Sequence, residues 1–304
     1  MSGECARPFL KWAGGKTQLL DKIGRRLPED INNGRYTTYV EPFVGGGAVF
    51  FRLAQTYDFQ ECYIADINSD LYITYTVVKR NVEELIDELR IIREEFLNCD
   101  IETRRDFYTT VRSEFNRTKN EVDYDRYSEA WILHASRLIF LNKTCFNGLY
   151  RVNLKGGFNV PFGKYKYYSI LQEDILQADA EVLQKTEIYQ GDFIDIATHI
   201  DENTFVYFDP PYRPLNSTSL FTGYAKNGFD DDEQRRLAAF FAECDAKEAH
   251  CMLSNSDPKN ADPKDEFFDE LYAGFNIDRV PAKRMINSDS SKRGSINEII
   301  VTNY

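Results

Sequence analysis

A short apolar segment that ends on an acid and two prolines constrains this chain more than any other feature. Residues 204–208 read Thr-Phe-Val-Tyr-Phe, and Asp209, Pro210, Pro211 and Tyr212 follow directly. Such a run predicts a strand buried on both faces of an α/β sheet. Sheets of this kind bind their ligands just beyond the carboxyl ends of the strands, so Asp209 is expected at a ligand site.

The residues of this turn suggest what it binds. Both prolines fix φ and Pro211 lacks an N–H, so the turn is stiff and the Pro210 carbonyl is expected to point outward as an acceptor. Tyr212 places a flat ring beside that carbonyl and the Asp209 carboxylate. Two fixed acceptors beside a stacking surface suit a planar group with an amine, such as adenine N6 or cytosine N4. Taken alone, the four residues could equally be a plain turn that closes a strand.

The composition indicates a globular protein with one large domain, or one domain with an insertion. The chain has 304 residues, of which 42% are hydrophobic, enough for a substantial core. No apolar stretch is long enough for a membrane span and charged residues interrupt the N-terminus, so we expect a cytoplasmic protein without membrane contact. The six cysteines and three histidines are scattered, which predicts neither a disulfide framework nor a metal site.

Basic residues gather in two segments of an acidic chain. The net charge of -12 argues by itself against a polyanionic partner. Residues 130–172, however, hold six Lys and Arg and no acid, where the overall frequency predicts about seven acids. Residues 279–293 hold five Lys and Arg against one acid. The two segments indicate a localised anionic ligand, unless they only solvate a hairpin and a loop.

The order of apolar runs predicts an α/β fold with an insertion. Strands are expected at residues 39–40, 62–65, 186–189, 204–208 and 250–253, and a terminal antiparallel hairpin at 275–281 and 296–302. Helices are expected at residues 50–54, after Asn68, at 82–96, 104–115 and 128–141, and at 231–243 with a cap at Asp230 or Asp231. Because three of these helices follow one another without a strand, a mainly helical insertion interrupts the predicted sheet.

A glycine-rich turn follows the first strand. Residues 41–47 read Glu-Pro-Phe-Val-Gly-Gly-Gly, and glycines there permit positive φ and close approach of the backbone to a ligand. About twenty residues later the second strand ends at Asp66, where an acid commonly accepts hydrogen bonds from ribose hydroxyls. A helix N-cap at Asp66 or Asn68 is the alternative, but it does not explain the pairing with the glycine turn.

Two further segments carry weaker signals. The Gly-Lys-Thr ending near the N-terminus suggests a phosphate-binding P-loop, but Leu10 stands where that motif needs glycine. Lys16 could still hold a carboxylate, and Trp12 could stack on a cofactor. Asp192 and Phe193 follow an expected strand, and such a pair can receive an adenine amine and cover its ring. An ordinary surface turn explains the pair equally well.

Taken in order, these segments resemble the Dam-type DNA adenine-N6 methyltransferases of the D12 class. The match spans nearly the whole chain and includes residues 12–16, 41–47, 66–68, 191–193 and 209–212. The resemblance implies a Rossmann-like class I methyltransferase sheet over residues 1–78 and 174–304, with S-adenosylmethionine as the methyl donor, and an inserted target-recognition domain over 79–173. By motif position it implies cofactor contacts at Trp12, Lys16, Phe43, Gly45, Gly47, Asp66, Asp192, Phe193 and Asp209, and catalytic roles for Asp209, Pro210 and Tyr212.

The acid-free segment is similar to the DNA-reading hairpin of GATC-specific members. Alternation around residues 156–157 independently indicates a hairpin, and a basic β-ribbon with aromatic tips suits groove entry. The resemblance implies double-stranded DNA as partner, with Arg151 on a guanine edge and apolar contacts from Leu149 and Pro161. The implied DNA contacts are Lys143, Phe146, Asn147, Leu149, Arg151, Asn153, Lys155, Pro161 and Tyr165; Phe146 stands where relatives can have tyrosine. Residues 287–291 resemble a loop that closes near target DNA.

Together these features predict a monomeric enzyme that methylates N6 of an adenine flipped out of duplex DNA, in the sequence GATC. Restriction–modification and DNA replication or repair are both contexts for such an enzyme. One alternative is a methyltransferase of the same plan that acts on another DNA sequence, on RNA or on a protein glutamine amide. Another is a nucleic-acid-binding module without catalysis. The basic hairpin argues against a protein substrate, and the intact Asp-Pro-Pro-Tyr turn argues against a binding module.

Overall fold

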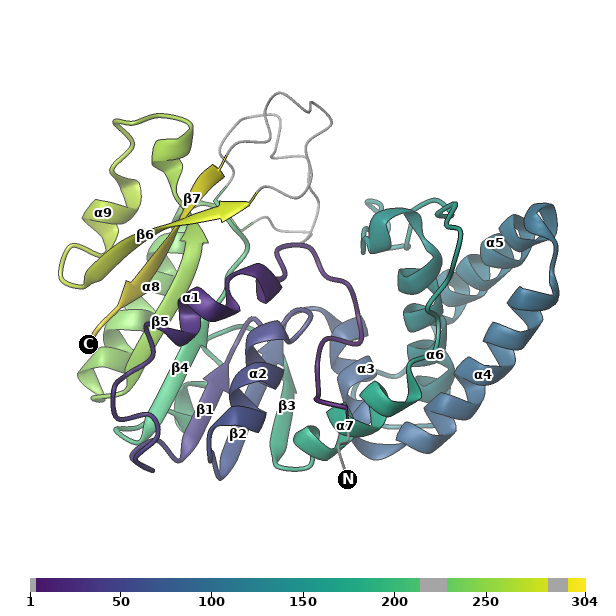
Figure 1. The fold of residues 1–304 in the computed structure, drawn as a ribbon, viewed down its shortest axis with the longest axis horizontal. Helices are drawn as coiled ribbons and strands as arrows, with labels where there is room; N and C mark the ends of the chain where they lie inside the picture. The colour runs from purple at the N-terminus through teal and green to yellow at the C-terminus, as the bar shows by residue number, and fades with distance from the viewer. Residues whose placement is uncertain (1–3, 214–228, 284–294) are drawn as a thin grey trace. The chain divides into compact units, whose positions relative to one another are not determined.

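The computed structural model describes residues 4–213, 229–283 and 295–304 of the chain (Figure 1). These residues divide into two compact units. The first is made of Met1–Gly15, Gly45–Gln55 and Asp66–Gly191, and the second of Lys16–Val44, Thr56–Ala65 and Asp192–Tyr304. The inserted recognition domain at residues 79–173 stays a prediction.

The second unit is built around a mixed β-sheet. Its strands are β1 (Thr38–Glu41), β2 (Glu61–Asp66), β4 (Thr204–Phe208), β5 (His250–Ser256), β6 (Asn276–Lys283) and β7 (Ser295–Thr302). They are ordered β2-β1-β4-β5-β7-β6. The first four run parallel, and β7 runs antiparallel to both β5 and β6. All five residues of β4 are buried, as its apolar sequence predicts for a strand covered on both faces.

The terminal hairpin lies at the edge of this sheet, in yellow in Figure 1. Its two strands pair along their whole length, from Asn276 opposite Thr302 to Lys283 opposite Ser295. The structure therefore confirms the predicted α/β fold with a terminal antiparallel hairpin.

The described helices of the second unit are short except for one. They are α1 (Leu20–Gly24), α8 (Asp231–Ala246) and α9 (Phe267–Leu271), with 3₁₀ turns at Lys16–Gln18, Ala197–His199 and Pro258–Asn260. Helix α8 packs against β5. Asp230 caps α8, because its Oδ1 accepts hydrogen bonds of 3.0 Å from the N–H groups of Asp232 and Glu233.

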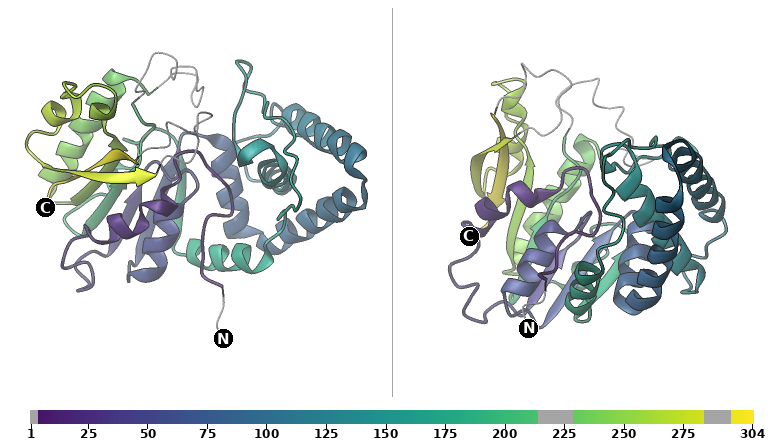
Figure 2. Two further views of the ribbon diagram at one scale, coloured as in Figure 1. Left: turned by 45° about the horizontal axis from the view of Figure 1, so that its top comes forward. Right: turned by 45° about the vertical axis from the view of Figure 1, so that its right-hand side comes forward.

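The first unit is mainly helical. It contains α2 (Ala48–Thr56), α3 (Ser69–Arg80), α4 (Val82–Asn98), α5 (Ile101–Thr118), α6 (Ala130–Thr144) and α7 (Glu173–Leu183), a 3₁₀ turn at Phe146–Gly148 and the strand β3 (Thr186–Gln190). Helix α6 packs against α3, α4 and α5 (Figure 2). Ten of its residues are buried, from Trp131 to Thr144, so α6 forms the centre of this unit's core.

Three described helices have no counterpart among the predicted ones. Helices α1 and α9 have five residues each, too few for an apolar period to repeat. Helix α7 carries a usable signal, because its buried residues Ile175, Leu176, Ala180 and Leu183 follow helical spacing. None of the described helices is long and apolar enough to cross a membrane.

Candidate active site

Asp209 follows β4 directly and is held by two side chains of the second unit. Its Oδ1 lies 2.6 Å from Lys16 Nζ and accepts a 3.2 Å hydrogen bond from Ser254 Oγ at the end of β5. The Lys16 side chain is only 4% exposed and that of Asp209 19%. Burial raises the pKa of Asp209, and the ion pair with Lys16 offsets this only in part. The end of β4 thus presents a carboxylate of raised pKa. Lys16, which the sequence suggested could hold a carboxylate, contacts that of Asp209.

Tyr212 is fixed at the other end of the turn. Its hydroxyl donates to Glu298 Oε2 on β7, and Lys16 Nζ lies 4.4 Å from the centre of its ring. Burial raises the pKa of Glu298, while Lys16 and the Tyr212 hydroxyl lower it in part. Sequence analysis did not identify Glu298, although it is the one acid of the otherwise apolar and neutral β7.

The backbone of the turn is held from α8 and β5. Gln234 Nε2 donates to the Pro211 carbonyl at 3.1 Å, and Asn255 Nδ2 donates to Gln234 Oε1 at 3.2 Å. Gln234, Ser254 and Asn255 are fully buried, so these polar groups depend on one another for hydrogen bonds. The outward direction of the Pro210 carbonyl stays a prediction.

In the first unit, Asp66 is bonded to the backbone of the glycine turn. Its Oδ2 accepts a 3.1 Å hydrogen bond from Gly45 N and its Oδ1 a 2.9 Å bond from Asn68 N. Burial raises the pKa of Asp66 to about 6, although both backbone donors lower it. Asn68 caps α3 through its own side chain. Asn68 is therefore the helix cap, and Asp66 is bonded to the glycine turn; the contact of Asp66 with a ribose stays a prediction.

The glycine turn has no room for larger side chains. Gly45 and Gly47 have φ values of 48° and 74°. A Cβ on Gly45 would lie 2.9 Å from the Trp12 ring, and one on Gly47 would lie 2.5 Å from Tyr75 Oη. The Trp12 ring itself stacks on Tyr150, with centroids 4.8 Å apart. Glycine is thus required at both positions by conformation and by space.

A buried charge cluster that sequence analysis did not identify lies at the start of α3. Asp70 is fully buried; its Oδ1 lies 3.0 Å from His134 Nε2 and its Oδ2 2.5 Å from Lys119 Nζ. The Tyr150 hydroxyl also donates to Oδ2. Burial alone would raise the pKa of Asp70, but His134 and Lys119 lower it to about 2. An acid in the first turn of a helix is ordinarily read as a favourable end charge, which hides this role in the sequence.

Asp192 and Phe193 lie in the second unit with Phe43. Arg236 binds both Asp192 oxygens, at 3.0 and 2.6 Å. Burial would raise the pKa of Asp192, but this pair and the Ile194 N–H hold it below its ordinary value. The Phe193 ring is buried, with its centroid 5.3 Å from that of Phe43. The structure therefore brings together these three predicted cofactor residues.

The predicted hairpin has two isolated bridges, Cys145–Phe162 at its base and Val152–Phe158 near its tip, rather than a regular ladder. Val152 pairs with Phe158 in an antiparallel bridge, and Asn153 N donates to Gly157 O at 2.8 Å. Asn153 Oδ1 also accepts from Lys155 N at 2.9 Å. Arg151, Asn153, Lys155 and Pro161 are exposed, as are Phe146 and Asn147, whereas Lys143, Leu149 and Tyr165 are partly buried.

Side chains of α5 hold the second arm of this hairpin. Asn116 accepts from Phe158 N at 2.7 Å and donates to Phe158 O at 3.0 Å. Tyr108 Oη donates to Val160 O at 2.7 Å and Arg112 to the same oxygen at 3.3 Å. Residues 108, 112 and 116 are spaced by four, so they share one helix face. Side chains on this face of α5 satisfy the backbone hydrogen bonds of Phe158 and Val160 that a neighbouring strand would otherwise make.

Of the second basic segment, only its start lies in the described residues. Arg279 is within 3.2 Å of Asp257 and 2.7 Å of Asp269, so this cation is neutralised within the unit. The loop at residues 287–291 lies outside the described residues.

The chain is similar to known proteins along almost its whole length. The family model for the D12 class N6 adenine-specific DNA methyltransferases matches residues 12–286. A type II methyltransferase of Methanocaldococcus jannaschii is 50% identical over 299 residues, 98% of this chain and 99% of that protein. A type II methyltransferase of Lactococcus lactis is 40% identical, covering 98% of this chain and 95% of that protein. A DNA adenine methylase of Escherichia coli is 34% identical, with coverages of 97% and 94%.

Proposed function

Because the chain belongs to the D12 class of N6 adenine-specific DNA methyltransferases, we propose that it transfers a methyl group from S-adenosylmethionine to a flipped adenine in GATC. The observation that carries this proposal is the turn at the end of β4. There, a buried acid of raised pKa and a fixed aromatic ring stand on either side of two prolines.

The residues of this turn suit an exocyclic amine. Lys16 and Ser254 both contact Oδ1 of Asp209, so Oδ2 can accept one N6 hydrogen while the Pro210 carbonyl accepts the other. Together these acceptors draw N6 toward tetrahedral geometry and direct its lone pair along one line, so positioning is the main contribution to the rate. The raised pKa of Asp209 helps it take up the proton released after transfer.

Tyr212 would provide the stacking surface for the flipped base. Its bond to Glu298 fixes the ring before a base arrives, which reduces the entropy lost on binding. A flipped base is commonly read through its Watson–Crick edge and held by stacking.

The implied cofactor residues are chemically suited to S-adenosylmethionine, which supplies an electrophilic methyl group when bound. Gly45 and Gly47 supply the positive φ values of the turn, and the Trp12 ring packs on Gly45. Asp66 has lone pairs for ribose hydroxyls beside its two backbone donors. Trp12, Lys16, Phe43, Asp192, Phe193 and Asp209 complete the proposed cofactor contacts.

The hairpin residues would read double-stranded DNA, with the recognition domain at residues 79–173. Asn159 steadies Arg151, because its Oδ1 accepts from Arg151 Nε at 2.7 Å and its carbonyl oxygen from Nη2 at 3.3 Å, which leaves further N–H groups on both outer nitrogens. The outer guanidinium nitrogens can then make the bidentate contact that identifies guanine. Leu149 and Pro161 would contact thymine methyl groups, with Lys143, Phe146, Asn147, Asn153, Lys155 and Tyr165 on the stack and backbone. A monomeric, cytoplasmic enzyme is part of the same proposal.

Methyl transfer from radiolabelled S-adenosylmethionine to duplexes with GATC, GTTC or a scrambled sequence tests the proposal. N6-methyladenine on the GATC duplex alone is the expected result. Asp209→Ala should abolish transfer and leave DNA binding largely intact, because the carboxylate acts on the amine and not on the duplex. Label at other adenines would reject GATC and keep the reaction. Label on RNA or protein only would reject DNA as the substrate.

A further inference from the structure

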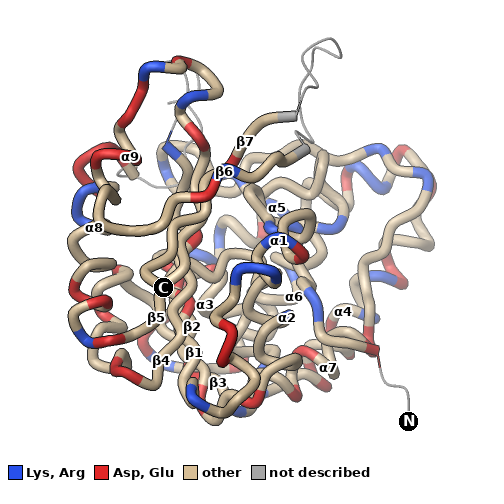
Figure 3. Tube along the Cα trace, turned by 60° about the vertical axis from the view of Figure 1, so that its left-hand side comes forward, with Lys and Arg blue, Asp and Glu red and all other residues tan. Residues whose placement is uncertain are grey.

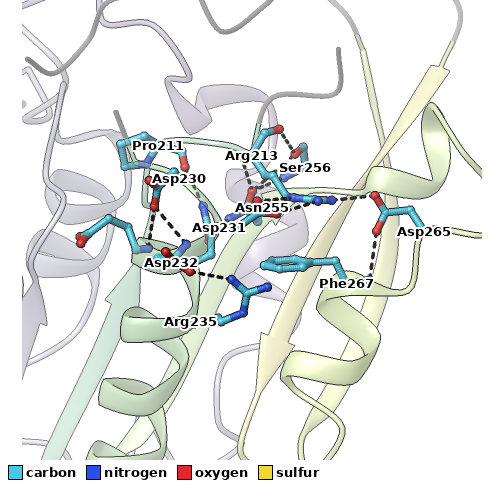
Figure 4. Close-up of polar contacts among 12 residues, drawn as sticks. Pro211, Arg213, Asp230, Asp231, Asp232, Arg235, Asn255, Ser256, Asp265 and Phe267 are labelled. Atoms are coloured by element: carbon cyan, nitrogen blue, oxygen red, sulfur yellow. Dashed lines mark hydrogen bonds and ion pairs between the residues drawn. The ribbon is translucent and has the colours of Figure 1, made fainter. Parts of the chain in front are cut away.

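Arg213 directly follows residues 209–212, the proposed catalytic turn, and is bound to two acids of the second unit (Figure 4). Its Nε and Nη2 donate to the two oxygens of Asp231 at 2.7 and 3.0 Å. Its Nη1 donates to Asp265 Oδ2 at 2.6 Å. The guanidinium also lies 4.2 Å from the centre of the Phe267 ring. A two-pronged pair with one carboxylate, a second carboxylate and a ring face together fix a guanidinium in one orientation.

The backbone of Arg213 is held as firmly as its side chain. Its N–H donates to Asn255 Oδ1 at 3.3 Å, and its carbonyl accepts from Ser256 Oγ at 3.1 Å. Asn255 in turn bonds Gln234, which donates to the Pro211 carbonyl. The end of the catalytic turn is therefore tied to both β5 and α8.

The charges around Arg213 do not suit a phosphate. Acids gather at the start of α8, where Asp231, Asp232 and Glu233 form the first turn, and on α9 (Figure 3). Asp231 on α8, and Asp265 just before α9, already accept from all three guanidinium nitrogens. Two cations, Arg213 and Arg235, face the three carboxylates of Asp231, Asp232 and Asp265 that pair with them, so the cluster does not attract a polyanion. A basic residue beside the active site of a DNA enzyme would ordinarily be assigned to the backbone of DNA.

We propose that Arg213 is a positioning residue for residues 209–212. Bound to Asp231 and Asp265, it holds the carboxyl end of the turn so that the Asp209 and Pro210 acceptors keep the separation that a single amine requires. This role rests on the proposed methyl transfer. A displacement of about 1 Å at reacting groups can cost about 100-fold in rate, so loss of Arg213 acts on the chemical step while substrate affinity is retained.

Steady-state and single-turnover kinetics of Arg213→Ala and Arg213→Lys test this role, with Arg235→Ala as the matched control. Arg235 also lies over the Phe267 ring, at 5.4 Å, but it pairs with the exposed Asp232. We expect Arg213→Ala to lower kcat between about 10- and 100-fold, with KM for both substrates within about threefold. Lysine cannot donate to both oxygens of Asp231 at once, so the kcat of Arg213→Lys should lie between those of wild type and Arg213→Ala. The kcat of Arg235→Ala should stay within about twofold of wild type.

Three results would overturn the proposal. Unchanged kcat, together with weaker DNA binding and a salt slope smaller by about one, would assign Arg213 to a phosphate. An equal loss in Arg235→Ala would indicate general destabilisation. The third result concerns the turn itself. If the wild-type enzyme methylates no DNA, the proposed function fails, and the positioning role is then tested by amide hydrogen exchange over residues 207–213. Faster exchange in Arg213→Lys than in Arg235→Ala supports it, and equal exchange rejects it.

Discussion

Asp70 and Asp209 are both buried acids, but their pKa values move in opposite directions. Asp70 in the first unit has no exposed side-chain surface and a pKa of about 2. Asp209 in the second unit is 19% exposed and has a raised pKa. Burial raises the pKa at both sites. At Asp70 the contacts with Lys119, His134 and Tyr150 outweigh the effect of burial on the pKa. Asp209 has one cation and one hydroxyl, Lys16 and Ser254, which do not outweigh it.

The difference separates an acid that maintains structure from one available for chemistry. A carboxylate with every oxygen bonded stabilises its surroundings and has little left to offer a ligand. A buried carboxylate with fewer partners is less stable as an anion and retains acceptor capacity, which is typical of functional sites. Because burial acts in the same direction at both acids, the opposite pKa shifts come from the number of partners.

Replacing both acids by asparagine should have the largest effect and separates them by stability. Asp70→Asn removes the anion that compensates Lys119 and should lower the free energy of unfolding by about 3–5 kcal/mol. Asp209→Asn should cost less, about 1–2 kcal/mol: it also removes the counter-ion of the buried Lys16, but burial already favours the neutral form at position 209. Urea unfolding of the two variants measures the difference. Equal losses in the free energy of unfolding would show that the partners of Asp70 contribute no more stability than those of Asp209.

The pH dependence of stability should give the next largest effect. Because the pKa of Asp70 is lowered from 3.8 to about 2, its stabilisation is complete above about pH 4 and disappears as the pH falls toward 2. The shift corresponds to about 2.5 kcal/mol. The stability difference between wild type and Asp70→Asn should therefore shrink between pH 6 and pH 3. For Asp209 the sign is opposite, since a raised pKa makes the anion costly at high pH. A difference for Asp70→Asn that grows toward low pH would contradict the assignment.

The smallest effect is expected from the two tyrosines that donate to these regions. Tyr150→Phe keeps the ring stacked on Trp12 but removes a donor from the Asp70 carboxylate, and should cost about 1.5 kcal/mol. Tyr212→Phe removes the bond to Glu298. Because the raised pKa of Glu298 makes its anion less favourable, the lost donor matters less there, and the change should cost about 0.5 kcal/mol. Thermal unfolding of both variants gives the order, and the reverse order would break the comparison.

The sequence predicts the regular elements of the fold well, for a physical reason. Strand β4 and the β6–β7 hairpin are specified by runs of buried apolar residues, which a period of two or an unbroken run reveals. The α5 and α8 segments are likewise helical, with ends a few residues beyond the predicted ones. Short helices such as α9 depend on their packing partners and leave no period to detect.

The candidate site was predictable where a motif carries it and not where contacts across the chain build it. Asp209 and Asp66 stand at strand ends, which the order of motifs locates. Glu298 and Lys119 are brought to their partners by folding alone: Glu298 is 86 residues from Tyr212 and Lys119 is 49 residues from Asp70. Nothing local in the sequence marks such pairs.

The α5 anchors have a consequence for how target recognition can change. Asn116, Tyr108 and Arg112 bind the backbone atoms of Phe158 and Val160, and a backbone atom is the same whatever side chain it carries. The exposed side chains of the hairpin can therefore be exchanged while its arm stays docked on α5. On the proposal that the hairpin reads DNA, mutational libraries confined to its tip would sample new target sequences on an unchanged scaffold.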